Sequence, residues 1–268
     1  MTATAETQHH QRLERLGFSY GRGGAHSSRT LMLDELQALL AFVDAPDAPK
    51  AAYQDAIKTA NCLGKRSVKT RALTFKHMAD LYALDPNLLV FRALRFFWTR
   101  DTPGQALLAT LAAYARDAIF RDSAPFMLDY AEGTIITRVA LEAFIDAQDP
   151  GRFSPATLKS TAQNVNSSWT KAGHLAGRAT KTRTRPTPTS GAVAYALLLG
   201  YVTGLRGESL FRSEFTRLFE CDFETTIALA EDASRRGWIA LNRVGRVVEV
   251  NFPNIITPQE MEWLRESH

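Results

Sequence analysis

Cysteine, long apolar runs and, over a central stretch, acidic residues are all scarce in this sequence. The two cysteines, Cys62 and Cys221, share no short spacing with each other or with histidine, which excludes a disulfide framework and a zinc pattern. The longest uncharged stretch, 186–205, is not apolar enough for a membrane span of ~20 residues. The first eleven residues are polar and lack the apolar region of a secretory signal. We therefore expect a cytoplasmic protein that does not engage a membrane.

Acidic residues are absent from Pro150 to Gly207, a region that carries eight lysines and arginines. A second acid-free window, between Asp55 and Asp80, carries six lysines and arginines. The net charge of the whole chain is only +4, so the rest of the sequence is net acidic. Phosphate is the usual ligand that disfavours carboxylates nearby, so these windows predict binding to double-stranded DNA.

The periodicity of apolar residues predicts a mainly α protein. We expect a helical N-terminal module with helix-turn-helix character, followed by winged-helix-like units with short β-hairpins. The predicted parts are a flexible arm over 1–26, a helical domain over 27–150, a winged-helix-like basic segment over 151–189, and a C-terminal winged-helix-like unit with a terminal helix over 190–268.

Two helices joined by a short break give the first module its helix-turn-helix character. The predicted helices cover 49–62 and 67–84, the second one capped by Ser67, and 63–66 forms the break. In the second helix the predicted buried stripe is Val68, Ala72, Phe75, Ala79 and Tyr82. The turn and the start of this helix offer four cations to a phosphate backbone, namely Lys65, Arg66, Lys69 and Arg71. The alternative is a plain helical hairpin with a charged tip.

A strong helix start at Ser154-Pro155 opens the most informative segment, a predicted helix over 155–171. Its buried stripe is Leu158, Ala162, Val165 and Trp169. The opposite face carries amides, hydroxyls and lysines but no acid, and its predicted DNA contacts are Lys159, Gln163, Asn164 and Lys171. The alternative is a solvated or protein-facing helix.

The residues after this helix, 174–188, predict a strand or hairpin that would act as a wing. Lys181, Arg183 and Arg185 alternate along it, so an extended chain would place all three cations on one exposed side, ready for phosphate. The alternative is an ordinary basic loop.

The last third of the chain repeats this plan with different charges. We expect helices over 191–203, 208–219 and 224–236, a hairpin with strands over 238–242 and 246–252, and a terminal helix opened by the capping box of Thr257 and Glu260. Acids stand on the predicted helix that would meet DNA, including Glu224, Glu231 and Asp232. This second unit is therefore predicted to be protein-facing or structural.

Catalytic patterns are missing. The segment Gly64-Lys65 lacks the earlier glycine and the following Ser or Thr of a phosphate-binding P-loop, and Gly207-Glu-Ser209 lacks the second glycine of a nucleophile elbow. Histidines show no metal spacing and carboxylates are scattered. We predict a protein that is not an enzyme and has no cofactor, metal ion or small-molecule substrate.

Two stretches resemble the BrxA family of bacterial BREX phage-exclusion systems. They are 61–71 (NCLGKRSVKTR), continued by 81–84 (LYAL), and 153–161 (FSPATLKST), continued by 169–175 (WTKAGHL). The resemblance implies a mainly helical, non-enzymatic defence component that binds DNA and works beside other BREX proteins. Its motifs point to the cations of the first stretch, Lys65 to Arg71, and to Lys159, Gln163, Asn164 and Lys171. The alternative function is a protein-interaction adaptor whose basic face docks onto an acidic partner.

Overall fold

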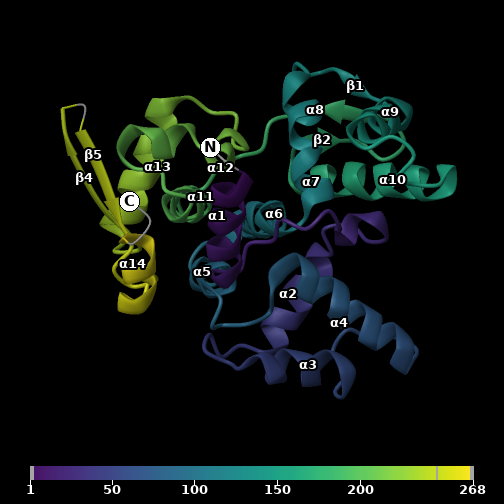
Figure 1. Cartoon of the computed structure of the whole chain (residues 1–268), viewed down its shortest axis with the longest axis horizontal. Coiled ribbons are helices and arrows are strands. Elements are labelled where there is room, and N and C mark those ends of the chain that lie inside the picture. The colour runs from purple at the N-terminus through teal and green to yellow at the C-terminus, as the bar shows by residue number, and fades with distance from the viewer. Residues whose placement is uncertain (1–2, 246, 266–268) are drawn as a thin grey trace. The chain divides into compact units, whose positions relative to one another are not determined.

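The computed structural model describes residues 3–245 and 247–265, and it is mainly helical with two small antiparallel sheets (Figure 1). This confirms the predicted mainly α class. The chain forms two compact units, each built from two stretches of sequence. Unit 1 comprises Met1–Arg92 and Ala112–Arg185, and unit 2 comprises Ala93–Leu111 and Pro186–His268. The division falls inside α5 (Leu89–Trp98) and α6 (Gln105–Arg116). The division into four parts at residues 26, 150 and 189 remains a prediction.

The N-terminal half of unit 1 consists of helices joined by short turns. They are α1 (Ala3–Arg15), the 3-10 helix η1 (Ala25–Ser27), α2 (Leu33–Phe42), α3 (Lys50–Lys58) and α4 (Val68–Tyr82). The chain after α3 turns and packs α4 against it, as predicted. Ser67 caps α4, since its hydroxyl oxygen accepts from the Thr70 N–H at 3.1 Å. This hydrogen bond satisfies one of the donors that a helix N-terminus leaves without an intrahelical partner.

The predicted buried stripe of α4 is wrong at its start. Val68 is 70% exposed and Ala72 is exposed, whereas Thr74, Met78 and Leu81 are buried together with Tyr82. Both sets of residues recur at helical spacing, so periodicity could not choose between them. The polar Thr74 belongs to the true stripe, and this leaves an outer face of α4 that carries Val68, Lys69 and Lys76.

The second half of unit 1 combines helices with a small sheet. Its elements are α7 (Ala118–Asp122), α8 (Ala124–Asp129), β1 (Ile135–Ile136), α9 (Arg138–Gln148), α10 (Pro155–Lys171), β2 (Leu175–Ala176) and β3 (Lys181–Arg183). The strands are antiparallel in the order β1-β3-β2, with Thr182 of β3 opposite Ile135 and Ala176. The apolar pattern of 134–147 predicts one helix, but its start forms β1 and α9 begins only at Arg138. The pattern of 104–121 also predicts one helix, but the chain is interrupted at Asp117, whose carboxylate accepts from the Phe120 N–H at 3.0 Å and starts α7.

Helix α10 is confirmed in its bounds and in most of its buried stripe. The Ser154 hydroxyl oxygen accepts from the Thr157 N–H at 3.2 Å, and Pro155 occupies the first turn. Ala162, Val165 and Trp169 are fully buried, and α9 packs alongside. The local signals for this helix agreed with its tertiary packing, and this agreement explains why the sequence predicted it well.

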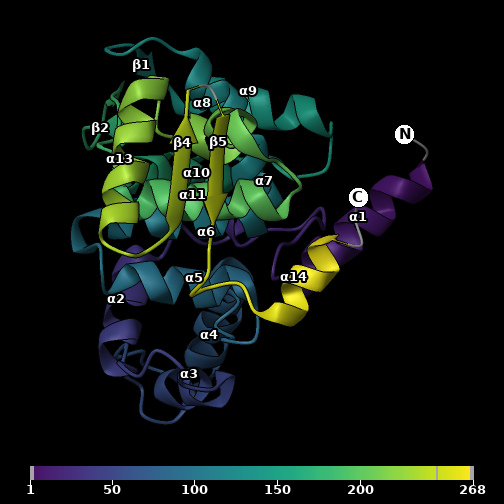
Figure 2. The same ribbon diagram turned by 90° about the vertical axis from the view of Figure 1, so that its left-hand side faces the viewer.

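Unit 2 surrounds one apolar helix. Its further elements are η2 (Thr102–Gly104), α11 (Ser190–Val202), η3 (Gly207–Arg212), α12 (Glu214–Arg217), α13 (Phe223–Arg235), β4 (Ala240–Val244), β5 (Val247–Asn251) and α14 (Pro258–Arg265). Every residue of α11 from Gly191 to Val202 is buried. Strands β4 and β5 form the predicted hairpin, drawn as a two-stranded ribbon in Figure 2. Arg246, the predicted first residue of the second strand, lies outside the described residues.

Two further predictions for unit 2 have different outcomes. The helix predicted over 208–219 is wrong, because η3 ends before Ser213 and the Ser213 hydroxyl caps the separate short helix α12. The terminal capping box is confirmed. Thr257 N–H donates to Glu260 Oε2 at 2.9 Å, and Glu260 N–H donates back to Thr257 Oγ1 at 3.3 Å.

Candidate nucleic-acid interface

The four cations around the α3–α4 turn differ in how far they are available to a ligand. Lys65 Nζ lies 3.1 Å from Glu35 Oε1, and both side chains are about three-quarters buried. Arg71 is half-buried, and its Nε makes no hydrogen bond in the described part of the chain. Arg66 and Lys69 are exposed, and neither forms an ion pair with the described residues. These two are therefore the cations that can reach a phosphate without breaking an existing contact.

The predicted DNA-contacting face of α10 is partly covered by the segment that precedes and opens α2. Lys171 Nζ lies 2.6 Å from Asp34 Oδ2, and Asn164 Nδ2 donates to the His26 carbonyl at 3.1 Å. Lys159 and Gln163 are exposed and stand one turn apart. The remaining exposed face is narrower than predicted, but it still carries no carboxylate.

The hairpin of β2 and β3 corrects one predicted contact. Arg183 is buried, with 1% of its surface exposed, so the expectation that all three cations of this strand face solvent is wrong. Its guanidinium donates to the carbonyls of Met127 at 2.8 Å and His174 at 2.9 Å, and also to the carbonyl of Thr184. Alternation along an extended strand does place Lys181 and Arg183 on one side, but α8 and the His174 turn cover that side at Arg183. Such a residue cannot meet a phosphate.

Lys181 and Arg185 remain on the surface of this hairpin. Lys181 Nζ donates to the Gly177 carbonyl at 2.7 Å and is half-exposed. Arg185 is 62% exposed, and its Nε lies 3.7 Å from Glu132 Oε2, a loose surface pair that contributes little to stability. Arg178, at the tip between the two strands, is also exposed.

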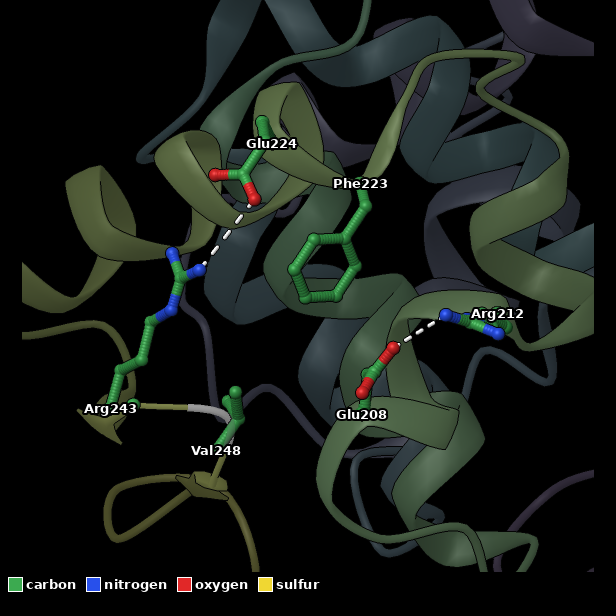
Figure 3. A pocket seen from close by; sticks show the side chains of 7 residues that line it. Glu208, Arg212, Phe223, Glu224, Arg243 and Val248 are labelled. Carbon is green, nitrogen blue, oxygen red and sulfur yellow. Dashed lines mark hydrogen bonds and ion pairs between the residues drawn. The ribbon is translucent and has the colours of Figure 1, made fainter.

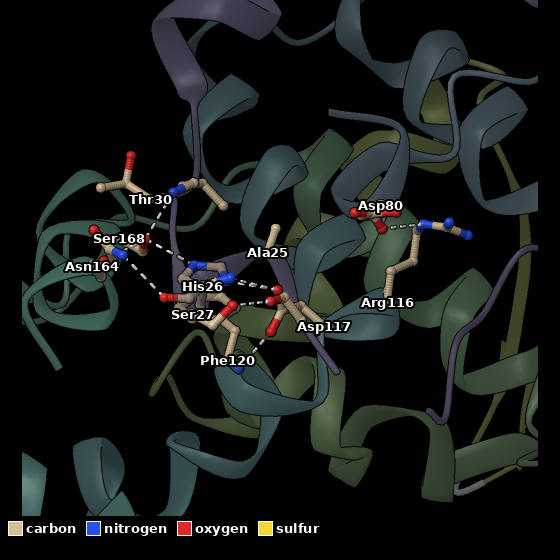
Figure 4. Close-up of polar contacts among 12 residues, drawn as sticks. Ala25, His26, Ser27, Thr30, Asp80, Arg116, Asp117, Phe120, Asn164 and Ser168 are labelled. Atoms are coloured by element: carbon tan, nitrogen blue, oxygen red, sulfur yellow. Dashed lines mark hydrogen bonds and ion pairs between the residues drawn. The ribbon is translucent and has the colours of Figure 1, made fainter. Parts of the chain in front are cut away.

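A buried polar network that the sequence did not predict holds the glycine-rich segment, residues 21–24, and the following η1 against α10 (Figure 4). His26 Nδ1 lies 2.9 Å from Asp117 Oδ2, and His26 Nε2 lies 2.9 Å from Ser168 Oγ. The main-chain N–H of His26 also donates to Asp117 Oδ2 at 3.1 Å. Gly24 permits this approach, since a Cβ there would stand 2.3 Å from Asp117 Oδ1. These partners lie 91 and 142 positions from His26, so no local pattern could have revealed them.

The order Asp117, His26, Ser168 is that of a hydrolase triad, but its surroundings exclude this chemistry. His26 and Ser168 are fully buried and Asp117 is 1% exposed. The Ser168 hydroxyl already donates to the Asn164 carbonyl and accepts from the Leu31 N–H, each at 2.8 Å. A nucleophile must be reachable by its substrate. The network therefore fixes the path of the chain between η1 and α2 against α10.

Unit 2 offers a pocket of about 410 Å³ between the start of α13 and the β4–β5 hairpin (Figure 3). Its charges cancel in pairs, because Arg243 lies 3.6 Å from Glu224 and Arg212 lies 2.5 Å from Glu208, with the Phe223 ring between the two pairs. Nothing in this arrangement attracts a phosphate.

The predicted acids of α13 are also engaged within unit 2. Asp232 accepts from the Ser190 hydroxyl at 2.6 Å and from Arg236 Nε at 2.7 Å, and these hydrogen bonds hold the pKa of Asp232 below its usual value. Asp232 therefore links α13 to the start of α11 by a hydrogen bond, in keeping with a structural role.

No family model, curated protein or solved structure matches this sequence. Over residues 3–245 and 247–265, no helix has both the length and the apolar character to cross a membrane. Over the same residues, no cluster of His, Cys, Asp and Glu is placed to hold a metal ion.

Proposed function

We propose that this protein binds duplex DNA, mainly through phosphate contacts, as a non-enzymatic cytoplasmic component of a bacterial BREX-type phage defence system. The observation that carries the proposal is the outer face of α10, where Lys159 and Gln163 are exposed within a segment that holds no carboxylate from Pro150 to Gly207. A helix that merely faces solvent normally mixes acids with lysines. A face that must lie against phosphates excludes the acids.

The topology around α10 supports a winged-helix mode of binding. Along the chain, helices α9 and α10 follow β1 and precede the β2–β3 hairpin, and the two helices pack against each other. The three strands form one sheet in the order β1-β3-β2. In this arrangement the helix before the hairpin enters the major groove, and the hairpin contacts the backbone beside it. We assign these roles to α10 and to the β2–β3 hairpin with Lys181 and Arg185. The α3–α4 pair, with Arg66 and Lys69, supplies a second set of phosphate contacts.

The BREX assignment rests on the sequence resemblance. The stretch 61–71 forms the turn before α4 and its first residues, and 153–161 forms the start of α10. Both resembling stretches thus coincide with the proposed DNA-binding elements, and this supports the assignment. The gene neighbourhood tests it, since we expect genes for other BREX proteins beside this one. A gene surrounded by unrelated functions would remove the assignment and leave the DNA-binding proposal in place.

The alternative function is an adaptor whose basic face docks onto an acidic partner. Two contacts favour it, because Lys65 and Lys171 already pair with carboxylates of the same chain, Glu35 and Asp34. The two functions differ in the ligand they require. A phosphate-binding surface accepts any duplex, whereas an adaptor recognises one protein.

Fluorescence anisotropy with several unrelated short duplexes at low salt separates these functions. DNA binding through phosphates predicts affinities that agree within about threefold among the duplexes, since the backbone is common to all sequences. Absence of binding to every duplex would contradict the proposed function and favour the adaptor.

A further inference from the structure

A second candidate site lies in unit 1, in a pocket of about 330 Å³. Its walls are the glycine-rich segment between α1 and η1, the C-terminal half of α4, and Arg116 at the end of α6. None of these residues belongs to the proposed DNA-binding set. The pocket therefore needs an explanation of its own.

Two glycines of this wall are not required by the fold. A Cβ at Gly21 or Gly23 would meet no atom within 4 Å, and neither residue has a positive φ. Gly24 differs, because the Asp117 carboxylate occupies the place of its Cβ. The main-chain N–H groups of Gly21 and Gly23 donate to no acceptor in the described part of the chain. Glycines that packing does not demand, with free N–H groups, are typical of loops that let an anion approach the backbone closely.

The opposite wall is positively charged. Lys76 and Arg116 line it together with one carboxylate, Asp80. Lys76 Nζ lies 2.9 Å from Asp80 Oδ2, but the lysine is 66% exposed, and such a pair costs little to rearrange. The Arg116 guanidinium donates to the main-chain carbonyls of Gly17, Ala79 and Asp80, which hold it in place at this wall.

His77 reports on the electrostatics of the same wall. Its side chain is 14% exposed, its Nδ1 makes no hydrogen bond among the described residues, and Asp80 Oδ2 stands 4.0 Å away. Burial lowers the pKa of His77 most, the charges of Arg29 and Lys76 lower it further, and the charge of Asp80 opposes them in part. The charged form of His77 is therefore disfavoured here, and a bound anion would raise its pKa by offsetting the charges of Arg29 and Lys76.

We propose that this pocket binds a phosphate group, with the N–H groups of Gly21 and Gly23 and the ammonium of Lys76 donating to its oxygens. Arg116 lines the same pocket and is held there by its hydrogen bonds to main-chain carbonyls. The phosphate belongs either to a small phosphorylated molecule or to the backbone of DNA, and the two sources share the same recognition chemistry. The site does not depend on the groove contact of α10.

Inorganic phosphate is the probe for the first experiment, with the full chain and with chloride at equal ionic strength as the reference. NMR titration of the His77 ring should show saturable binding of phosphate and a rise of about one unit in the pKa of His77, since a bound anion stabilises its charged form. Phosphate that leaves the His77 resonance unchanged up to high millimolar concentrations would overturn the proposal.

Variants locate the binding. Lys76→Met should weaken phosphate binding at least about fivefold through loss of a charged hydrogen bond, whereas Lys50→Met, which removes a similarly exposed lysine outside the pocket, should not. Gly21→Ala together with Gly23→Ala should weaken it while leaving the thermal midpoint unchanged, because the added methyl groups meet no protein atom. Equal weakening by Lys50→Met would contradict the assigned location.

A competition experiment identifies the source of the phosphate. A duplex without terminal phosphates that displaces inorganic phosphate assigns the pocket to the DNA backbone. Phosphate that stays bound in the presence of duplex assigns it to a small phosphorylated molecule. A protein that binds phosphate at His77 but no duplex at all would refute the proposed function and keep this site.

Discussion

Asp117 performs three tasks with one buried carboxylate. It caps α7 through Phe120 N–H, accepts from the main-chain N–H of His26, and lies against the His26 ring. Replacing it by asparagine removes the charge and turns one acceptor into a donor. We predict that Asp117→Asn lowers the free energy of unfolding by about 2–4 kcal/mol, measured by urea denaturation.

Asp47→Asn is the matched control for this variant, because Asp47 is exposed. It should change the free energy of unfolding by less than about 0.5 kcal/mol. A loss for Asp117→Asn as small as that of the control would show that the His26 network does not stabilise the fold.

The same carboxylate predicts a dependence of stability on pH. Burial raises the pKa of Asp117, but the charge and hydrogen bonds of His26 and the N–H of Phe120 outweigh burial, so this pKa lies below its usual value. A lowered pKa contributes stability that is complete above the unfolded value of about 3.9 and is lost as pH falls through the folded value. The difference in unfolding free energy between the wild type and Asp117→Asn should therefore shrink below about pH 4. A difference that stays constant down to the acid transition would contradict this.

Arg183 differs from the neighbouring cations Lys181 and Arg185 because its side chain is buried. Its replacement by alanine leaves the carbonyls of Met127 and Thr184 without this donor and leaves the His174 carbonyl with only the Thr184 N–H, so Arg183→Ala should cost about 3 kcal/mol or more. Lys181→Ala with Arg185→Ala should leave the fold intact, as seen by circular dichroism, and reduce DNA affinity. A stable Arg183→Ala variant would show that this guanidinium is not structural.

At the scale of elements, charge should distinguish α10 from α13. Lys159→Glu with Lys181→Glu places two acids on the proposed DNA-binding surface and should lower DNA affinity at least about tenfold, or about 1.4 kcal/mol, at low salt. Lys171 is left alone because it already pairs with Asp34. The matched change on α13 is Glu231→Lys, which spares the structural Asp232 and should leave binding unchanged or raise it slightly. Loss of binding in the α13 variant alone would mean that unit 2 carries the DNA-binding helix.

The elements that the sequence predicted well are those whose local signals and packing agree. Helix α10 has a serine cap, a proline in its first turn and an apolar stripe that is buried, so its bounds were predicted correctly. The predicted helix over 208–219 failed because Ser213, in the middle of an apolar pattern, caps a new helix. Strand β1 has only two residues and exists because β3 pairs with it, so no local pattern could indicate it.

At the scale of the whole molecule, each unit is assembled from two stretches of sequence. The chain enters unit 2 at Ala93, returns to unit 1 at Ala112 and leaves it again after Arg185. The boundaries at Ala93 and Ala112 fall inside α5 and α6, so no change in the sequence marks them and a prediction from the sequence misses them. The charge windows predicted which segments carry the candidate site. They could not show that Arg183 is buried or that Lys65 and Lys171 are paired, because those contacts are made by residues distant in sequence.

The central claim is that unit 1 holds DNA by its phosphates, and a salt titration of duplex affinity tests it most directly. The cations suited to this role are the exposed Arg66, Lys69, Lys159 and Arg185 and the half-exposed Lys181. Five phosphate contacts predict that the logarithm of affinity falls against the logarithm of salt concentration with a slope of about −4 to −5. Lys159→Ala should reduce the magnitude of this slope by about one. An affinity that does not change between low and physiological salt would contradict the account.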